Sequence, residues 1–174
     1  HEPSRRQRQM CIRDSARVVL LDKANRVFLM HGSDPMRPEK GTWWEIPGGG
    51  IEPGETSQEA AARELYEECG FRDVKVGPCI WTQYVEFDFA MYHFKSDESI
   101  HIALTSESSE WNPQGLEALE AAAFDDAQWW SIDDLVAAQV QTLPNRLLEF
   151  LPDIIAGNIP ADPIDISPAE GDNG

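Results

Sequence analysis

The stretch from Gly48 to Phe71 reads GGGIEPGETSQEAAARELYEECGF and contains a glycine-rich turn, a short acidic loop and a helical pattern. Thr56 followed three residues later by Glu59 is a capping box, which satisfies two backbone donors at a helix start and contributes about 1 kcal/mol. Gly70 favours the left-handed conformation that commonly ends a helix. We therefore expect a helix over Thr56–Cys69. One apolar stripe of this helix is expected to face the core: Ala61, Leu65 and Cys69.

Three glutamates lie on one face of this predicted helix. Glu64, Glu67 and Glu68 are spaced i, i+3 and i+4, so their side chains converge on one patch of helix surface. Like charges at this spacing repel by roughly 0.2–0.5 kcal/mol per exposed pair. A divalent cation with oxygen ligands would replace that repulsion by coordination. The ordinary alternative for such a cluster in an acidic protein is a solvated surface.

The residues around the glutamates favour the metal site, because the whole stretch resembles the Nudix box, G-x5-E-x7-R-E-U-x-E-E-x-G-U, in which U is a bulky aliphatic residue. Phe71 stands at the last position, where an aliphatic is usual, and it is also bulky and apolar. The box covers about an eighth of the chain. Its fixed residues are all present: Gly49, Glu55, Arg63, Glu64, Leu65, Glu67, Glu68 and Gly70.

The resemblance implies an α/β domain with the Nudix fold, a mixed β-sheet sandwiched between α-helices. It implies a hydrolase that cleaves a diphosphate linkage in a nucleoside diphosphate joined to another moiety. The metal ligands would be Glu64, Glu67 and Glu68, assisted by a backbone carbonyl near Gly49. Oxygen-only ligands favour Mg²⁺ or Mn²⁺ as the cofactor.

The same resemblance assigns supporting roles. Glu55 and Arg63 would orient the metal ligands, and loosely held ligands lose affinity or rate. The general base in this family can be a glutamate of the box or an acid on a later loop. Glu67 is the first candidate here, and Glu117 or Glu120 in the acidic segment is the alternative.

Four residues before the box are candidates for substrate binding. Arg37 and Lys40 lie in a loop that leads into the site, where they would reach a substrate phosphate or remain solvated. The following strand alternates Trp43 and Glu45 on one face with Trp44 and Ile46 on the other. One tryptophan is expected in the core, and the other is available to stack on a base.

Composition limits the partners. The 174 residues predict one main domain, and the net charge of −17 argues against general nucleic-acid binding and against an anionic membrane surface. The three cysteines lack metal-ligand spacing, and no window resembles a signal peptide or a membrane span. We expect a cytoplasmic protein with a small nucleotide substrate. A homodimer is left open.

The chain divides into three predicted parts: an extension over residues 1–15, a Nudix domain over 16–157 and a loose acidic, proline-containing tail over 158–174. The run Met10–Ser15 resembles a translated sequencing-library adapter, so the extension is expected to be disordered or non-native. Within the domain we expect a hairpin over 16–31, strands over 43–47, 74–76, 79–94, 100–105 and 124–131, a turn at Ser96–Ser99, and helices over 132–139 and 144–157, with a break near Pro152.

Substrate markers downstream of the box are not met, since Pro78 comes too early for an ADP-ribose marker and Tyr84 and Tyr92 straddle the position of a dinucleoside-polyphosphate marker. Two substrate classes remain: a nucleoside triphosphate, ordinary or oxidised, and a nucleoside diphosphate linked to a sugar.

Two non-hydrolytic alternatives remain as well. One is a silent Nudix-fold nucleotide sensor, and the other is an isopentenyl-diphosphate-type isomerase, which would need a catalytic cysteine.

Overall fold

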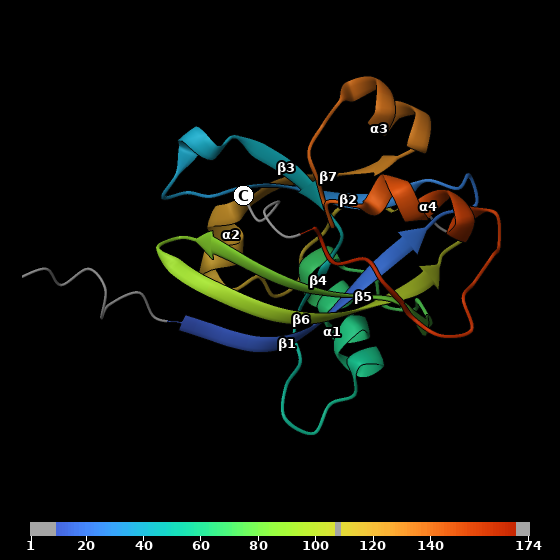
Figure 1. Cartoon of the computed structure of the whole chain (residues 1–174), viewed down its shortest axis with the longest axis horizontal. Coiled ribbons are helices and arrows are strands. Elements are labelled where there is room, and N and C mark those ends of the chain that lie inside the picture. The colour runs from blue at the N-terminus through green and yellow to red at the C-terminus, as the bar shows by residue number, and fades with distance from the viewer. Residues whose placement is uncertain (1–9, 107–108, 170–174) are drawn as a thin grey trace, which may run out of the picture.

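A computed structural model describes residues 10–106 and 109–169, which form a mixed α/β domain (Figure 1). The mixed sheet with flanking helices confirms the predicted fold class. The strands are β1 Met10–Leu21, β2 Val27–Ser33, β3 Thr42–Glu45, β4 Gly48–Gly50, β5 Val76–Phe89, β6 Tyr92–Leu104, β7 Phe124–Trp130, β8 Thr142–Leu143 and β9 Ile164–Asp165. The helices are the 3-10 helix η1 Pro38–Lys40 and the α-helices α1 Ser57–Cys69, α2 Ala118–Ala123, α3 Ile132–Ala138 and α4 Leu147–Ile155.

The nine strands form one sheet in which the order β8-β3-β2-β1-β6-β5-β9 is supplemented by β4 beside β1 and β7 beside β2. β1 and β2 are paired at Leu21 and Val27, next to their connecting turn. Away from that turn the two strands have different neighbours: β2 pairs with β3 and β7, whereas β1 pairs with β4 and β6. The sheet therefore has two parts that are joined at one hairpin.

Apolar side chains fill both faces of β1, because successive residues of a strand point to opposite faces. Val19 and Leu21 belong to one buried cluster, which α3 and α4 cover through residues such as Leu135 and Leu151. Ala16, Val18 and Leu20 belong to a second cluster, which α1 covers. The predicted core stripe of α1 is confirmed, since all three of its residues are buried in this second cluster: Ala61, Leu65 and Cys69.

The start of β1 differs from the prediction. The sequence placed residues 1–15 outside the folded domain, yet β1 begins at Met10 and pairs in parallel with β6 from Met10–His93 to Leu21–Leu104. Ser15 is fully buried, and its hydroxyl lies 3.0 Å from that of Ser96. The polar composition of this run concealed strand pairing, which depends on the partner β6. Residues 1–9 lie outside the described part of the chain.

The predicted turn at Ser96–Ser99 is also wrong, because these residues lie within strand β6. β6 is continuous through these residues, and the turn lies at Ala90–Met91, where φ is 49° and 72°. The sequence favoured a turn at Ser96–Ser99 because all four residues are polar. Ser96 and Glu98 are nevertheless buried, and they hydrogen-bond to neighbouring side chains of the sheet.

Residues 147–166 are more ordered than predicted, and residues 170–174 of the predicted tail lie outside the described part of the chain. α4 begins at Leu147 and runs through Pro152 without a break, with Leu151 and Ile154 buried on its core face. Burial of this apolar face outweighs the hydrogen bond that proline cannot donate.

The tail adds β9, which pairs with β5, and Ile166 is fully buried, so residues 164–166 are not loose. None of the helices in the described ranges is long and apolar enough to cross a bilayer.

Candidate active site

Helix α1 carries the site, and its ends form as the sequence predicts. The Thr56 hydroxyl accepts a hydrogen bond from the Glu59 amide at 3.1 Å, and the Glu59 carboxylate accepts one from the Thr56 amide at 3.1 Å. Gly70 ends the helix with φ 87°. A Cβ at this position would stand 2.2 Å from the Asn112 carbonyl oxygen, so both the conformation and the space require glycine.

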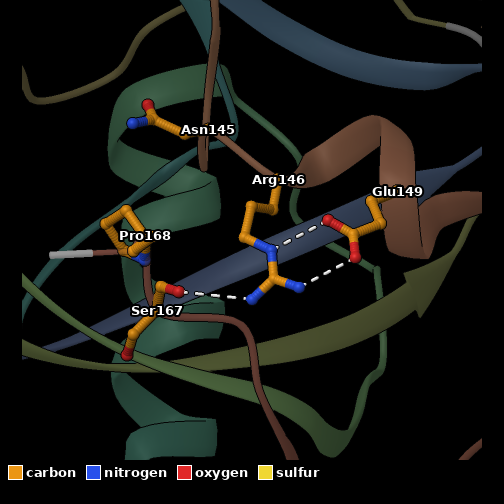
Figure 2. Close-up of a pocket in the computed structure, with 6 residues that line it drawn as sticks. Asn145, Arg146, Glu149, Ser167 and Pro168 are labelled. Carbon is orange, nitrogen blue, oxygen red and sulfur yellow. Dashed lines mark hydrogen bonds and ion pairs between the residues drawn. The ribbon is translucent and has the colours of Figure 1, made fainter. Parts of the chain in front are cut away.

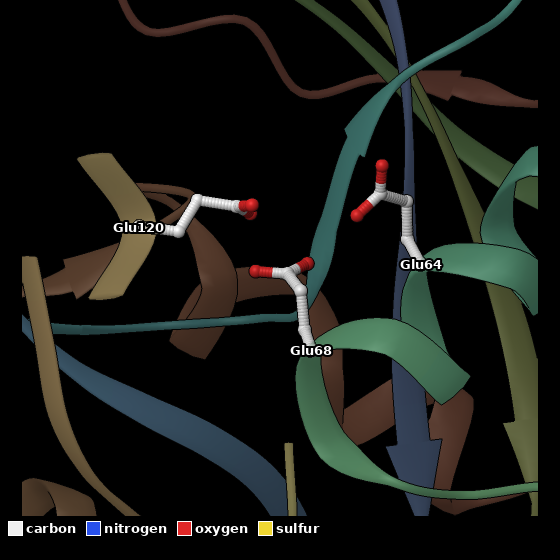
Figure 3. A group of neighbouring side chains, drawn as sticks. All are labelled: Glu64, Glu68 and Glu120. Carbon is white, nitrogen blue, oxygen red and sulfur yellow. The ribbon is translucent and has the colours of Figure 1, made fainter. Parts of the chain in front are cut away.

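Three carboxylates converge beside α1, and we call Glu64, Glu68 and Glu120 the acid cluster. One carboxylate oxygen from each lies within 4.8 Å of those of the other two. Glu64 and Glu68 come from α1, whereas Glu120 comes from α2 and points toward them (Figure 3). Oxygen ligands from three separate carboxylates form a donor set suited to Mg²⁺ or Mn²⁺.

The glycines of β4 allow the main chain to approach this cluster. The Gly48 amide donates a hydrogen bond to the Glu68 carboxylate at 2.8 Å. A Cβ on Gly49 would stand 2.6 Å from Oε1 of Glu64, so any larger residue would displace that carboxylate. Glycine at positions 48 and 49 therefore allows the backbone to lie against the acidic side chains.

Burial makes the acid cluster electrostatically unfavourable without a cation. Burial raises the pKa of Glu68 well above its usual range, and the charges of Glu120 and Glu64 raise it further. Burial also raises the pKa of Glu64, against the hydrogen bond from Arg63. Carboxylates that are gathered and desolvated in this way gain from a bound divalent cation.

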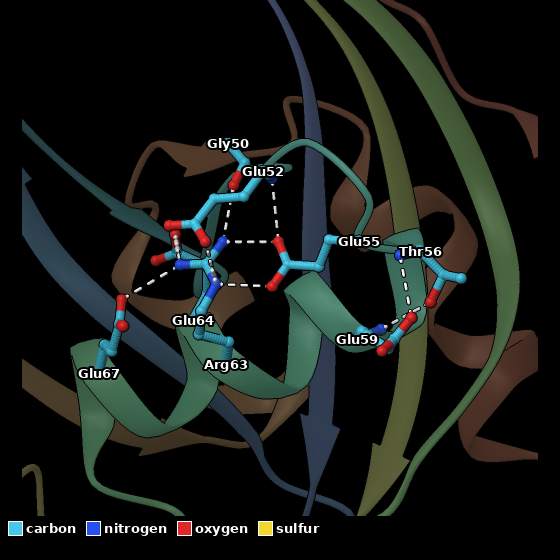
Figure 4. Close-up of polar contacts among 8 residues, drawn as sticks. All are labelled: Gly50, Glu52, Glu55, Thr56, Glu59, Arg63, Glu64 and Glu67. Atoms are coloured by element: carbon cyan, nitrogen blue, oxygen red, sulfur yellow. Dashed lines mark hydrogen bonds and ion pairs between the residues drawn. The ribbon is translucent and has the colours of Figure 1, made fainter.

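Arg63 ties the loop before α1 to the glutamates of the helix (Figure 4). Its guanidinium makes two parallel hydrogen bonds to Glu55, at 2.8 and 3.0 Å, and these bonds lower the pKa of the Glu55 carboxyl. It also donates to Glu64 at 2.9 Å, to Glu67 at 3.2 Å and to the Gly50 carbonyl at 2.9 Å. This geometry suits the orienting role that the resemblance implies for Arg63 and Glu55.

Glu67 and Glu120 occupy different positions from those that the sequence emphasised. Glu67 pairs with Arg63 and its side chain is 38% exposed, so it borders the acid cluster without belonging to it. Glu120, predicted as an alternative base, supplies the third carboxylate instead. Glu117 caps α2, where its amide donates to Glu120 at 3.1 Å. The roles of Glu67 and Glu120 stay predictions.

The sequence missed a second polar group on the sheet, which we call the sheet cluster: Arg17, Glu45 and Glu98. Arg17 donates from Nε to Glu98 at 2.6 Å and lies 3.5 Å from Glu45. Burial lowers the pKa of Arg17, but the charges of Glu98 and Glu45 more than reverse this and raise it. An arginine within the otherwise apolar run of residues 16–21 was the available signal.

The candidate substrate-binding residues lie in two places. Trp43 donates from its indole nitrogen to Glu45 at 3.0 Å, so these two side chains form one unit on β3. Trp44 is buried with Ile46, so Trp44 is the one of the two tryptophans that lies in the core. Arg37 is exposed, and Lys40 donates to the Asp88 carbonyl at 2.8 Å, so both lie at the loop between β2 and β3 rather than with the acid cluster.

A cavity of about 430 Å³ lies elsewhere, between the start of α4 and the C-terminal segment (Figure 2). Arg146 lines it, and its donors are already bonded to Glu149 at 2.8 Å and to the Ser167 carbonyl at 3.3 Å. No residue of the acid cluster lines this cavity. Its size alone therefore does not make it the active site.

Comparison with known proteins agrees with the geometry. The NUDIX domain model matches residues 12–154. An 8-oxo-dGTP diphosphatase from Proteus vulgaris is 39% identical over 75 residues, 43% of this chain and 62% of that protein, so the match spans less than two thirds of the relative. An RNA pyrophosphohydrolase from Francisella philomiragia is 34% identical over an alignment of 127 residues that covers 68% of this chain and 77% of that protein.

Solved structures support the same fold. The crystal structure of the MutT protein from Methanosarcina mazei Go1 superposes with a TM-score of 0.58 and 19% identity, covering 86% of this chain and 97% of that one. With a family model that matches most of its length, the chain belongs to the NUDIX domain family. It is a Nudix hydrolase, an enzyme of the class that contains pyrophosphohydrolases and diphosphatases.

Proposed function

We propose that this enzyme is a Mg²⁺- or Mn²⁺-dependent hydrolase of a diphosphate linkage in a small nucleotide. The acid cluster carries the proposal, because three carboxylates gathered within 4.8 Å, two of them buried, form a ligand set for a hard divalent cation. We propose that Glu64, Glu68 and Glu120 hold the ion, with Glu67 and the backbone carbonyl of Gly49 as the remaining predicted ligands.

A divalent ion bound there would polarise the P–O bonds of the substrate and lower the pKa of a bound water. The protein side chains have separate tasks. Arg63, paired with Glu55, fixes the loop before α1 relative to the α1 glutamates through five hydrogen bonds. Glu67 is proposed to accept the proton of the attacking water, because its partly exposed carboxylate remains accessible to solvent.

For the substrate we favour a nucleoside triphosphate, ordinary or oxidised, over a nucleotide sugar. The Proteus vulgaris relative is named for 8-oxo-dGTP, which belongs to the first class. The Francisella relative is named for RNA, but a net charge of −17 opposes a long polyanion. Trp43 and Glu45 would contact the base, and Arg37 would contact a phosphate, because Lys40 is already bonded to the Asp88 carbonyl. A cytoplasmic location and a homodimer stay predictions.

The alternative of a catalytic cysteine, which an isomerase would need, is not favoured. Cys69 is buried in the core with its thiol 3.9 Å from the sulfur of Met30. Burial raises its pKa well above the usual range, so a thiolate there is unfavourable. The remaining alternative is a silent nucleotide sensor, and turnover distinguishes it from the hydrolase.

The test is product release from a panel: the four nucleoside triphosphates, 8-oxo-dGTP, ADP-ribose, nucleotide sugars, diadenosine polyphosphates and a 5′-triphosphorylated RNA. Each is incubated with Mg²⁺, with Mn²⁺ and with a chelator. We expect chelator-sensitive release of a nucleoside monophosphate from one class. Glu68→Gln should lose this release, and its matched control is Glu149→Gln, which removes a carboxylate from the exposed surface of α4. Nucleotide binding without any turnover would contradict the hydrolase and favour the sensor.

A further inference from the structure

Two segments that are distant in sequence are joined at one end of the molecule. One is the loop of residues 34–41 between β2 and β3, and the other is the tip of the β5–β6 hairpin; both lie at the left of Figure 1. Asp34 accepts a hydrogen bond from the Ala90 amide at 3.2 Å. Lys40 donates to the Asp88 carbonyl at 2.8 Å. We call these two contacts the clasp.

The two contacts of the clasp bind the main chain at Asp88 and Ala90, the residues before and after Phe89. The Phe89 ring packs edge-on against Trp43, with ring centroids 6.4 Å apart and an interplanar angle of 79°. Trp43 in turn donates a hydrogen bond to Glu45 at 3.0 Å. A continuous series of contacts therefore runs from Asp34 through Phe89 to the two residues proposed to contact the base.

Asp34 is built into this position. Its side chain is buried, with the residue only 2% exposed, and its second oxygen accepts the Met36 amide at 2.9 Å. Lys40 lies 3.7 Å away and supplies a positive charge. A buried carboxylate with these partners holds a fixed geometry, since each lost partner would leave part of the charge unsatisfied.

The hairpin tip needs such support. Ala90 and Met91 both adopt a positive φ, 49° and 72°, which residues with side chains adopt at an energetic cost. The cavity beside the clasp holds only about 30 Å³, far below the roughly 300 Å³ or more of ligand pockets. These observations favour a structural role for the clasp, in which it acts on its neighbours without binding substrate.

We infer that Asp34 is a positioning residue, which sets, through Phe89, the wall that Trp43 and Glu45 present to the nucleoside part of the substrate. The inference rests on the proposed function and extends it to a carboxylate that the substrate does not touch. It implies a selective effect. Affinity for a nucleoside triphosphate should depend on Asp34, whereas affinity for inorganic triphosphate, which lacks the nucleoside, should not.

The experiment compares Asp34→Ala with the wild-type protein by calorimetric binding of each of the four nucleoside triphosphates and of inorganic triphosphate. Ca²⁺ replaces Mg²⁺ so that the ligands outlast the measurement. We expect the best-bound nucleoside triphosphate to bind about tenfold more weakly, a loss of about 1.4 kcal/mol of binding free energy. Inorganic triphosphate should bind within about twofold of wild type. If Asp34→Ala does not fold, Asp34→Asn keeps the shape and removes the charge.

Asp22→Ala is the matched control. Asp22 is also a buried aspartate in a turn, and it accepts the Ala24 and Arg26 amides at 2.9 and 2.8 Å, but it lies in the β1–β2 turn and takes no part in the clasp. It should lower stability without changing the preference for nucleosides.

Equal loss of both ligand types, or no loss of either, would overturn the positioning role. So would a wild-type protein that binds no nucleoside triphosphate more tightly than inorganic triphosphate. Failure of the proposed function is detected separately, as absent chelator-sensitive turnover by the wild-type enzyme.

Discussion

The acid cluster and the sheet cluster both bury glutamates, but they differ in how the charge is balanced. In the sheet cluster, Arg17 supplies a cation from within the chain, 2.6 Å from Glu98. In the acid cluster, Arg63 donates to Glu64 at 2.9 Å but is shared with Glu55 and Glu67, and Glu68 has the Gly48 amide as its hydrogen-bond donor and two further glutamates as neighbours. The difference teaches that buried acids alone do not define a metal site; a shortage of positive charge in the protein is the more informative feature.

The largest expected effect is a loss of stability when the cation of the sheet cluster is removed. Arg17→Met leaves Glu98 and Glu45 buried without their cation, so the free energy of unfolding should fall by about 3–5 kcal/mol. Chemical denaturation measures it. The double variant Arg17→Met/Glu98→Gln should recover much of the loss, because it also removes the unpaired charge. If the single variant is as stable as wild type, the two clusters do not differ in the way described.

The next largest effect concerns the acid cluster, where Glu68→Gln should lower activity and leave stability unchanged or higher. Turnover with Mg²⁺ should fall by at least about a hundredfold, beyond the loss typical of an outer partner of a metal ligand. The melting temperature in chelator should be unchanged or higher, because one repelling charge is gone. Steady-state kinetics and thermal unfolding test both parts. A large drop in melting temperature with activity kept would place Glu68 in the core rather than at the metal.

The pH dependence of stability gives a smaller but specific test. The raised pKa of Glu68 means that the folded protein holds this proton more tightly than the unfolded chain. Its contribution to stability is therefore complete below the ordinary carboxyl pKa of about 4.3 and is lost as the pH rises through the folded value. In chelator, wild-type stability should fall more steeply with rising pH than that of Glu68→Gln. Parallel curves from pH-dependent denaturation would contradict the burial of an ionisable group there.

The smallest effect is expected for Arg63→Lys, which keeps the charge but cannot make the paired hydrogen bonds to Glu55. Activity at saturating Mg²⁺ should fall about tenfold, and the Mg²⁺ concentration for half-maximal activity should rise. Metal titration of the initial rate measures both changes. An unchanged metal dependence would show that Arg63 does not orient the ligands.

The sequence predicts α1 and its caps because those features depend on neighbours within four residues. The Thr56–Glu59 box, the Gly70 end and the buried stripe through Leu65 are all confirmed. The family followed from the same local stretch and is confirmed by the match over residues 12–154. Local rules thus sufficed for the part of the site that one helix carries.

The remaining features depend on partners that the sequence does not reveal. The strand before Ala16 forms because β6 lies beside it, and the buried Glu98 of β6 is paired with Arg17 of the neighbouring strand β1. Glu120 lies beside Glu64 and Glu68 because of the placement of α2 relative to α1. A domain boundary at Ala16 stays a prediction, although β1 begins six residues earlier.

The parallel pairing of β1 with β6 has a consequence for how the chain folds. Partners such as Ser15 and Glu98 are separated by more than eighty residues, so their contact requires closure of a long loop. Contacts of this span slow folding, whereas the capped helix α1 can form early from local interactions. We expect the helix to be present in the transition state and the β1–β6 pairing to form late, an order that φ-values at Leu65 and Val18 would report.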